Sequence, residues 1–157
     1  SQGARQKGVR MKHSPNRAAL EGKRVVLIDD SIVRGTTSLK LVRAVRAAGA
    51  REVHLRSASP QILFPDFYGI DMPERTQLMA ATHTMGEMRA ILEVDSLGFL
   101  SIDGLYDAMG VGPRDPAQPQ FTDHYFTGDY PTRLVDREIE EGGRDARGSQ
   151  LSLLVTA

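Results

Sequence analysis

The stretch 25–37 constrains the fold of this chain more than any other part of it. It opens with the aliphatic run 25–28, continues with the acids Asp29 and Asp30, and closes on a Gly-Thr-Thr sequence. A short β-branched run bounded by charged residues is typical of a strand that is buried on both faces in a parallel sheet. We therefore expect a central strand here, with two carboxylates at its C-terminal end.

The residues after this stretch predict a helix and then a second strand. Hydroxyl side chains at 36–38 can cap a helix whose apolar face ends just before Gly49. Apolar and polar residues then alternate over 52–58, which is the pattern of a strand. Strand, helix and strand in this order form a βαβ unit with a right-handed crossover. The sequence thus predicts an α/β fold, a parallel sheet flanked by helices.

The remainder of the chain carries weaker signals. A connection rich in Pro, Asp and Gly runs over 59–73, and a capping-box pattern begins at Thr84. We expect helices over 74–81, 84–92 and 102–109 and a strand over 97–100. Beyond 111 the chain has four Pro and many polar residues, which predicts an irregular tail. We divide the whole chain into a domain over 1–110, which opens with a mobile loop over 1–17, and a C-terminal extension over 111–157.

Composition excludes several classes of protein. The longest aliphatic run is far too short to cross a membrane, and the absence of cysteine removes disulfides, thiolate metal sites and a cysteine nucleophile. These features fit a reducing, cytoplasmic setting. Residues 1–24 hold seven of the 20 Lys and Arg and one of the 20 Asp and Glu, so this segment is strongly basic. Every Phe and Tyr lies between Phe64 and Tyr130, so a small phosphorylated ligand is favoured over nucleic acid.

Candidate binding groups gather where the first strand passes into the first helix. Ligands of open α/β sheets bind at the C-terminal edge of the strands, where Asp29 and Asp30 fall. Gly35 and the hydroxyl residues 36–38 then supply backbone N–H groups at a helix N-terminus, which suits one phosphate. The two acids suit ribose hydroxyls, a divalent cation or both. This combination outweighs the plainer interpretation, in which the acids only end a strand, and predicts a magnesium-bound sugar phosphate.

These residues resemble a known family. The stretch 25–37 is similar to the phosphoribosyl pyrophosphate (PRPP) signature of type I phosphoribosyltransferases. Further segments resemble the amidophosphoribosyltransferases, glutamine-dependent enzymes that begin purine synthesis: 30–38, 68–71, 95–97 and 126–132. The resemblance implies an incomplete phosphoribosyltransferase-like sheet. It also implies a reaction in which ammonia displaces pyrophosphate from PRPP.

The resemblance also implies roles for individual residues. Asp29 and Asp30 correspond to acids that hold the PRPP ribose hydroxyls and Mg²⁺. The 5-phosphate loop corresponds to Ser31, Gly35, Thr36, Thr37 and Ser38. The segment 9–12 resembles the end of a flexible loop that closes over PRPP, and Lys12 corresponds to a lysine that contacts its phosphates. The alternative for Lys12 is a solvated loop charge.

The departures from the family shape our expectations. The family takes ammonia from glutamine with an N-terminal cysteine in a separate domain, so we expect a C-terminal portion that is inactive alone. We find no match to the pyrophosphate loop before Ser1 either. Some members hold an iron–sulphur cluster, but Asp66, Pro119 and Thr122 occupy the cysteine positions, so no cluster is expected. The resemblance further implies purine nucleotide inhibitors and a homo-oligomer.

Two rivals stay open at this stage. One is a non-catalytic module that senses PRPP and controls RNA or another protein, and the other is a transferase acting on a nucleobase. The segments 68–71 and 126–132 argue against both, because they are specific to the amidophosphoribosyltransferases. NTPase, dinucleotide-binding, zinc-protease and serine-hydrolase motifs are absent from the sequence.

Overall fold

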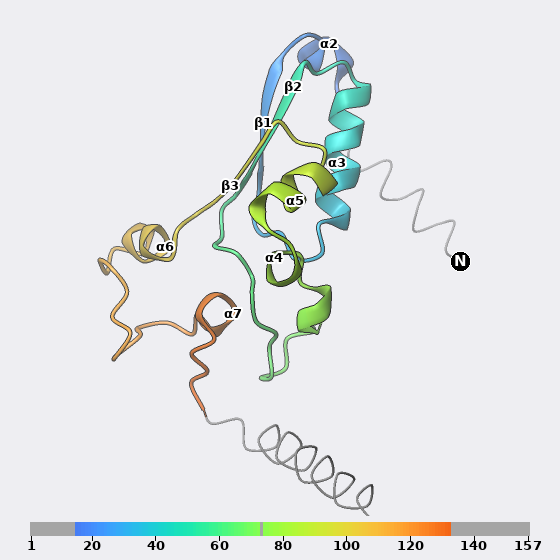
Figure 1. The fold of residues 1–157 in the computed structure, drawn as a ribbon. Helices are drawn as coiled ribbons and strands as arrows, with labels where there is room; N and C mark the ends of the chain where they lie inside the picture. Colours follow the sequence, from blue (N-terminus) through green and yellow to red (C-terminus); the bar gives the residue numbers. More distant parts are fainter. Residues whose placement is uncertain (1–14, 73, 133–157) are drawn as a thin grey trace, which may run out of the picture.

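The computed structural model describes residues 15–72 and 74–132, which form an α/β unit with α3 and α5 on one face of a sheet, followed by a trailing segment (Figure 1). Its elements in chain order are α2 (Arg17–Leu20), β1 (Arg24–Asp29), α3 (Thr36–Ala47), β2 (Glu52–Ser57), η1 (Arg75–Gln77), α4 (Met79–Thr82), α5 (Met85–Ile91), β3 (Ser96–Phe99), α6 (Ile102–Ala108) and α7 (His124–Thr127). The strands form one parallel sheet in the order β1-β2-β3. The predicted α/β fold and its βαβ unit are confirmed.

The core lies between the sheet and the helices α3 and α5. Val42 and Val45 of α3 meet Val53 and Leu55 of β2 there, and Met88 brings in α5. All five side chains are buried. Burial of this apolar surface is the main force that holds α3 and α5 on the sheet, at about 25 cal/mol per Å².

The prediction that the first strand is central is wrong. Among the described residues, β1 pairs with β2 alone and therefore forms an edge of the sheet. Val25 and Leu27 face the core, but Val26 is 58% exposed and Ile28 is 76% exposed. An aliphatic run without alternation needs cover on both faces, and the described residues supply it on one.

The predicted helix over 74–81 is interrupted in the structure. It is replaced by the short helices η1 and α4, which meet at Leu78. Leu78 is fully buried with an extended backbone, and the Met79 amide donates a hydrogen bond to the Val33 carbonyl at 2.8 Å. Burial of Leu78 and this contact with the loop after β1 outweigh helix continuity. The capping box from Thr84 to Glu87 is confirmed at the start of α5.

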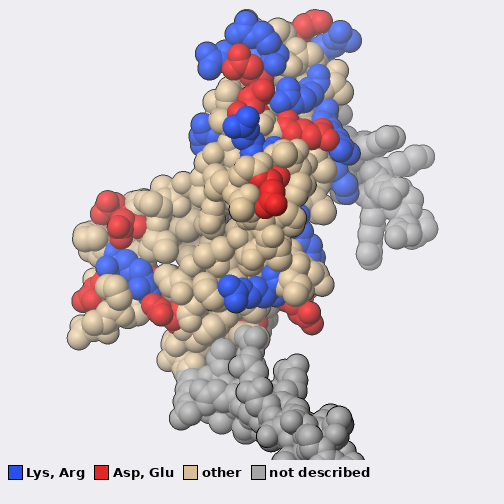
Figure 2. Space-filling model, in the orientation of Figure 1, with Lys and Arg blue, Asp and Glu red and all other residues tan. Residues whose placement is uncertain are grey.

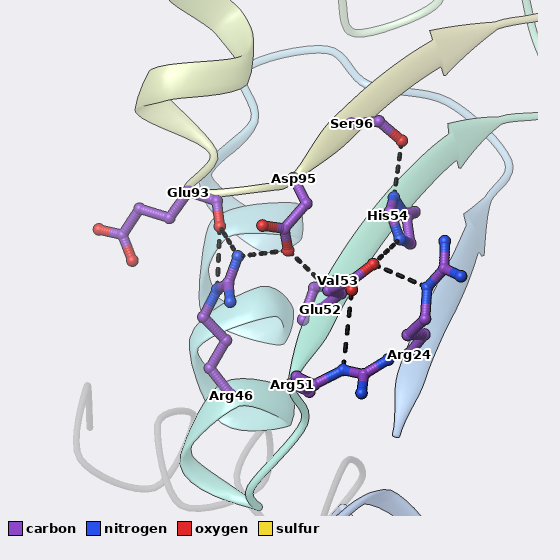
Figure 3. A network of polar contacts seen from close by, with 9 residues as sticks. All are labelled: Arg24, Arg46, Arg51, Glu52, Val53, His54, Glu93, Asp95 and Ser96. Carbon is purple, nitrogen blue, oxygen red and sulfur yellow. Dashed lines mark hydrogen bonds and ion pairs between the residues drawn. The ribbon is translucent and has the colours of Figure 1, made fainter. Parts of the chain in front are cut away.

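A polar network ties the N-terminal ends of the strands to α3 (Figure 3). The Asp95 carboxylate accepts hydrogen bonds from the Val53 amide at 2.7 Å and from the Arg46 guanidinium at 2.9 Å. Arg46 also donates to the Glu93 carbonyl. The Asp95 position in the 95–97 segment therefore has a structural explanation: it fixes the start of β3 to β2 and α3.

Charged side chains gather around α2 and the N-terminal ends of β1 and β2, whereas the middle of the face shown is largely uncharged (Figure 2). Several of these charges are paired, as in Arg17–Glu21 at 3.1 Å and Arg24–Glu52 at 2.7 Å. None of the helices that the structure describes has the length and apolarity that crossing a membrane requires.

Candidate phosphoribosyl-binding site

An open cavity of about 410 Å³ lies at the C-terminal end of β1 and the N-terminal end of α3. It is lined by Asp29, Asp30, Ser31, Val33, Arg34, Gly35, Thr36, Thr37, Ser38, Asp71 and Met72. The structure thus brings every site residue predicted between 29 and 38 to one cavity. Lys12 and the segment 9–12 lie outside the described residues.

The loop after β1 is organised by short contacts of its two acids. Asp29 accepts a hydrogen bond from the Asp30 amide at 3.1 Å, and its other oxygen accepts one from the Ser38 hydroxyl at 3.1 Å. Asp30 accepts one from the Ser31 amide at 2.7 Å. The Ser38 contact ties the first turn of α3 to the end of β1. It uses the Ser38 hydroxyl proton, so the backbone amide is the Ser38 donor that remains for a ligand.

The N-terminus of α3 has the features of an anion site. Gly35 precedes the helix with φ +72°, and no side chain among the described residues caps the first turn. The amides of Thr36, Thr37 and Ser38 therefore face the cavity end of a twelve-residue helix. Unsatisfied amides and the positive end of the helix dipole together favour a phosphate.

Gly35 is required by close packing as well as by its backbone conformation. A Cβ atom added there would lie 2.6 Å from the Met79 sulfur and 3.2 Å from a Leu92 methyl carbon. Both neighbours belong to the buried core. The turn before α3 therefore packs directly on the core through a residue that has no side chain.

The donor set of the cavity fits Mg²⁺ only in part. Asp29 and Asp30 offer the hard oxygen atoms that Mg²⁺ prefers, and among the described residues no hydrogen-bond donor reaches Asp30 Oδ2. Yet no group of three or more His, Cys, Asp or Glu side chains in the described part of the chain could hold a metal by itself. This set suits a cation that completes its coordination with substrate oxygens and water.

Asp71 and Met72 are cavity residues that sequence reasoning missed. They come from the long connection after β2, and no periodic signal links that connection to the loop after β1. The only hint was that Asp71 belongs to the 68–71 segment, which carries the family resemblance.

Asp66, one of the positions compared with cluster cysteines, is buried and fully engaged in hydrogen bonds. Burial by itself raises the pKa of this carboxyl. Hydrogen bonds from the Ile70 and Tyr68 amides and from the Tyr125 and His124 side chains outweigh that effect and lower the pKa to about 2. Asp66 is therefore ionised at neutral pH and serves as a hydrogen-bond acceptor inside the fold.

Comparisons with known proteins point to one family. No protein-family model matches the chain. It is 61% identical over 150 residues to the amidophosphoribosyltransferase of Rhizobium etli. The match covers 95% of this chain and 29% of that protein. It is 48% identical over 139 residues to the Bacillus subtilis amidophosphoribosyltransferase, covering 88% of this chain and 29% of the relative. Sequence and fold match one segment of the amidophosphoribosyltransferases.

Among solved structures, glutamine PRPP amidotransferase from B. subtilis, in complex with ADP and GMP, superimposes with a TM-score of 0.72 at 47% identity. The match covers 85% of this chain and 29% of the amidotransferase. The expected phosphoribosyltransferase-like α/β fold is thus confirmed. This chain spans less than a third of the length of the amidophosphoribosyltransferases it matches.

Proposed function

We propose that this chain carries the PRPP-binding site of an amidophosphoribosyltransferase. The observation that carries the proposal is the cavity at the end of β1, where two carboxylates and the uncapped N-terminus of α3 meet. A sugar phosphate needs both kinds of group in one place. Identity of 61% to the R. etli enzyme supports the choice of PRPP over other sugar phosphates.

In this proposal each part of the ligand has its own partners. The 5-phosphate lies on the amides of Gly35 to Ser38, and Ser31 lines the same loop. Asp29 and Asp30 take the ribose hydroxyls, and both would also hold Mg²⁺, which would supply positive charge to offset that of the pyrophosphate. Lys12 closes over the phosphates.

The reaction proposed is the displacement of pyrophosphate from the anomeric carbon of PRPP by ammonia. A C–N bond forms, the C–O bond to pyrophosphate breaks with its electron pair, and the ammonium nitrogen then loses a proton. The transition state resembles an oxocarbenium ion, so no side chain needs to act as a nucleophile. The residues of this chain position the sugar and complement its charge. The product, phosphoribosylamine, begins purine synthesis.

The partners follow from the same proposal. Ammonia comes from a glutaminase domain, because this chain has no cysteine to attack glutamine. Purine nucleotides compete at the site since they carry the same ribose 5-phosphate, and the B. subtilis amidotransferase was solved with ADP and GMP. We also propose that the protein is a homo-oligomer and works in a reducing, cytoplasmic setting. The two Arabidopsis relatives are named as chloroplastic. Within residues 15–72 and 74–132, no feature favours a non-catalytic PRPP sensor.

Calorimetric titration of the purified protein with PRPP in the presence of Mg²⁺ tests the proposal. Asp29→Asn combined with Asp30→Asn should abolish binding, because it removes the ribose and cation partners. Asp107→Asn combined with Asp115→Asn is the matched control, since it removes two exposed acids that do not line the cavity. Equal affinity of the two double variants, with circular dichroism showing both folded, would refute the site.

A further inference from the structure

A buried carboxylate joins the loop 67–72 to α7. The Asp66 side chain is 1% exposed and accepts hydrogen bonds from four donors. Two are backbone amides of the loop, those of Tyr68 and Ile70, each at 2.8 Å. The other two belong to α7: His124 Nε2 at 3.0 Å and the Tyr125 hydroxyl at 3.1 Å. We call the side chains of Asp66, His124 and Tyr125 the Asp66 clasp.

The clasp restrains the backbone of this loop directly. Phe67, Tyr68 and Ile70 are exposed, but the rings of Phe67 and Tyr68 lie against that of Tyr130, and the Tyr68 hydroxyl hydrogen-bonds with Thr132. The amide hydrogen bonds to Asp66 add a restraint on the main chain itself. Charged acceptors make hydrogen bonds about twice as strong as neutral ones, and a buried carboxylate keeps that strength.

The α7 side of the clasp is itself firmly held. His124 is 1% exposed, and among the described residues its Nδ1 atom has no hydrogen-bond partner. Its polar contact in this part of the chain therefore runs through Nε2 to Asp66. The Tyr125 carbonyl accepts from the amides of Leu63 and Phe64, which places α7 beside the segment leading to Asp66.

The loop held by the clasp ends on the wall of the cavity. Asp71 and Met72 follow directly after Ile70 and line the same space as Asp29 and Asp30. Asp66 itself does not line the cavity. A shift of the loop would move the Asp71 carboxylate relative to the other two acids, and so change the field in which a cation and a pyrophosphate must fit.

We propose that Asp66 is a positioning residue for PRPP binding, which acts through the loop 67–72 by setting the place of Asp71 at the cavity. The inference rests on the proposed function and adds to it a group that never touches the ligand. It also gives α7 a part in the site, because two of the four hydrogen bonds to Asp66 come from there.

A double-mutant cycle tests the proposal in the full chain. Asp66→Asn, Asp71→Asn and the double variant are titrated with PRPP at fixed Mg²⁺, with thermal unfolding measured for each. Each single change should weaken PRPP by about tenfold, the usual cost of losing one charged contact. The double variant should bind no more weakly than Asp71→Asn alone, since Asp66 acts through Asp71. A merely structural role predicts additive losses, or lower stability at unchanged affinity.

Two further variants keep the test decisive if Asp66→Asn fails to fold. Tyr125→Phe removes one donor to Asp66 and should weaken PRPP in the same direction by a smaller factor. Tyr106→Phe is its matched control, because it also removes a buried hydroxyl that donates to a carboxylate, that of Asp123, outside the clasp. Equal effects of the two on PRPP affinity would overturn the positioning role.

The outcome also separates this inference from the proposed function. Wild-type protein that does not bind PRPP overturns both. Wild-type binding that is lost in the Asp29→Asn, Asp30→Asn variant but shows additive effects at Asp66 and Asp71 leaves the proposed function intact and overturns the positioning role alone.

Discussion

Replacing Gly35 with Ala should destabilise the fold through two separate effects. The backbone at Gly35 has φ +72°, and a residue with a Cβ atom pays about 1 kcal/mol to adopt that region. The new Cβ would also lie 2.6 Å from the Met79 sulfur, closer than real Cβ contacts come. Forcing a methyl group into a packed core costs about 1–3 kcal/mol. We therefore expect a total loss of about 2–4 kcal/mol.

Gly110→Ala is the control that isolates the packing effect. Gly110 also has positive φ, at +77°, but a Cβ atom there would have no neighbour within 4 Å. This variant should lose only the backbone contribution of about 1 kcal/mol. Only the Gly35 change should also weaken PRPP, because only Gly35 lies at the cavity.

Urea unfolding followed by circular dichroism suits the comparison, since the chain has no Trp for fluorescence. In thermal scans the melting temperature should fall by about 5–15 °C for Gly35→Ala and by a few degrees for Gly110→Ala, using about 2–4 °C per kcal/mol. If Gly35→Ala is no more destabilising than Gly110→Ala, the turn does not rest on the core as described.

Three further outcomes are expected. Because the pKa of Asp66 is lowered to about 2, the stability it contributes is present above pH 4 and is lost as the pH falls towards 2; Asp66→Asn should remove that part of the acid sensitivity in urea midpoints. Arg114→Met removes the cationic partner of the buried Asp123 carboxylate and should cost about 3 kcal/mol, against less than about 0.5 kcal/mol for Arg17→Ala in an exposed pair. Ile28→Thr should reduce self-association in analytical ultracentrifugation, because exposed apolar side chains on the open face of β1 favour contact between chains.

Each of these expectations has a result that contradicts it. If the urea midpoints of wild type and Asp66→Asn fall equally with pH, the hydrogen bonds to Asp66 do not lower the pKa of its carboxyl. Equal costs at Arg114 and Arg17 would show that the Arg114–Asp123 pair is solvated. Unchanged association of Ile28→Thr would mean that the open face of β1 is not a contact surface.

Local patterns in the sequence predicted the elements that are determined by residues close together in the chain. The βαβ unit follows from an aliphatic run, a Gly turn and a helical stripe, each of which acts within a few residues. The capping box at Thr84 is equally local. The site residues between 29 and 38 were predicted for the same reason, because one turn carries them all.

What the sequence could not show depends on partners distant in the chain. An aliphatic run does not reveal whether other elements of the described chain pack on both faces of the strand, so the sequence did not predict the exposure of Ile28. Leu78 interrupts a helical pattern because it is needed in the core, which no local propensity records. Asp71 reaches the cavity through a long connection, and Asp66 was noted only as a replaced cysteine.

The most direct test of the central claim is an NMR titration of ¹⁵N-labelled protein with ribose 5-phosphate and then with PRPP and Mg²⁺. The account predicts that the amide resonances of Gly35, Thr36, Thr37 and Ser38 shift most with both ligands. Their shifts should give the same dissociation constant for PRPP as calorimetry. Amides that stay in place while resonances elsewhere shift would contradict the phosphate site at the N-terminus of α3, and with it the proposed function.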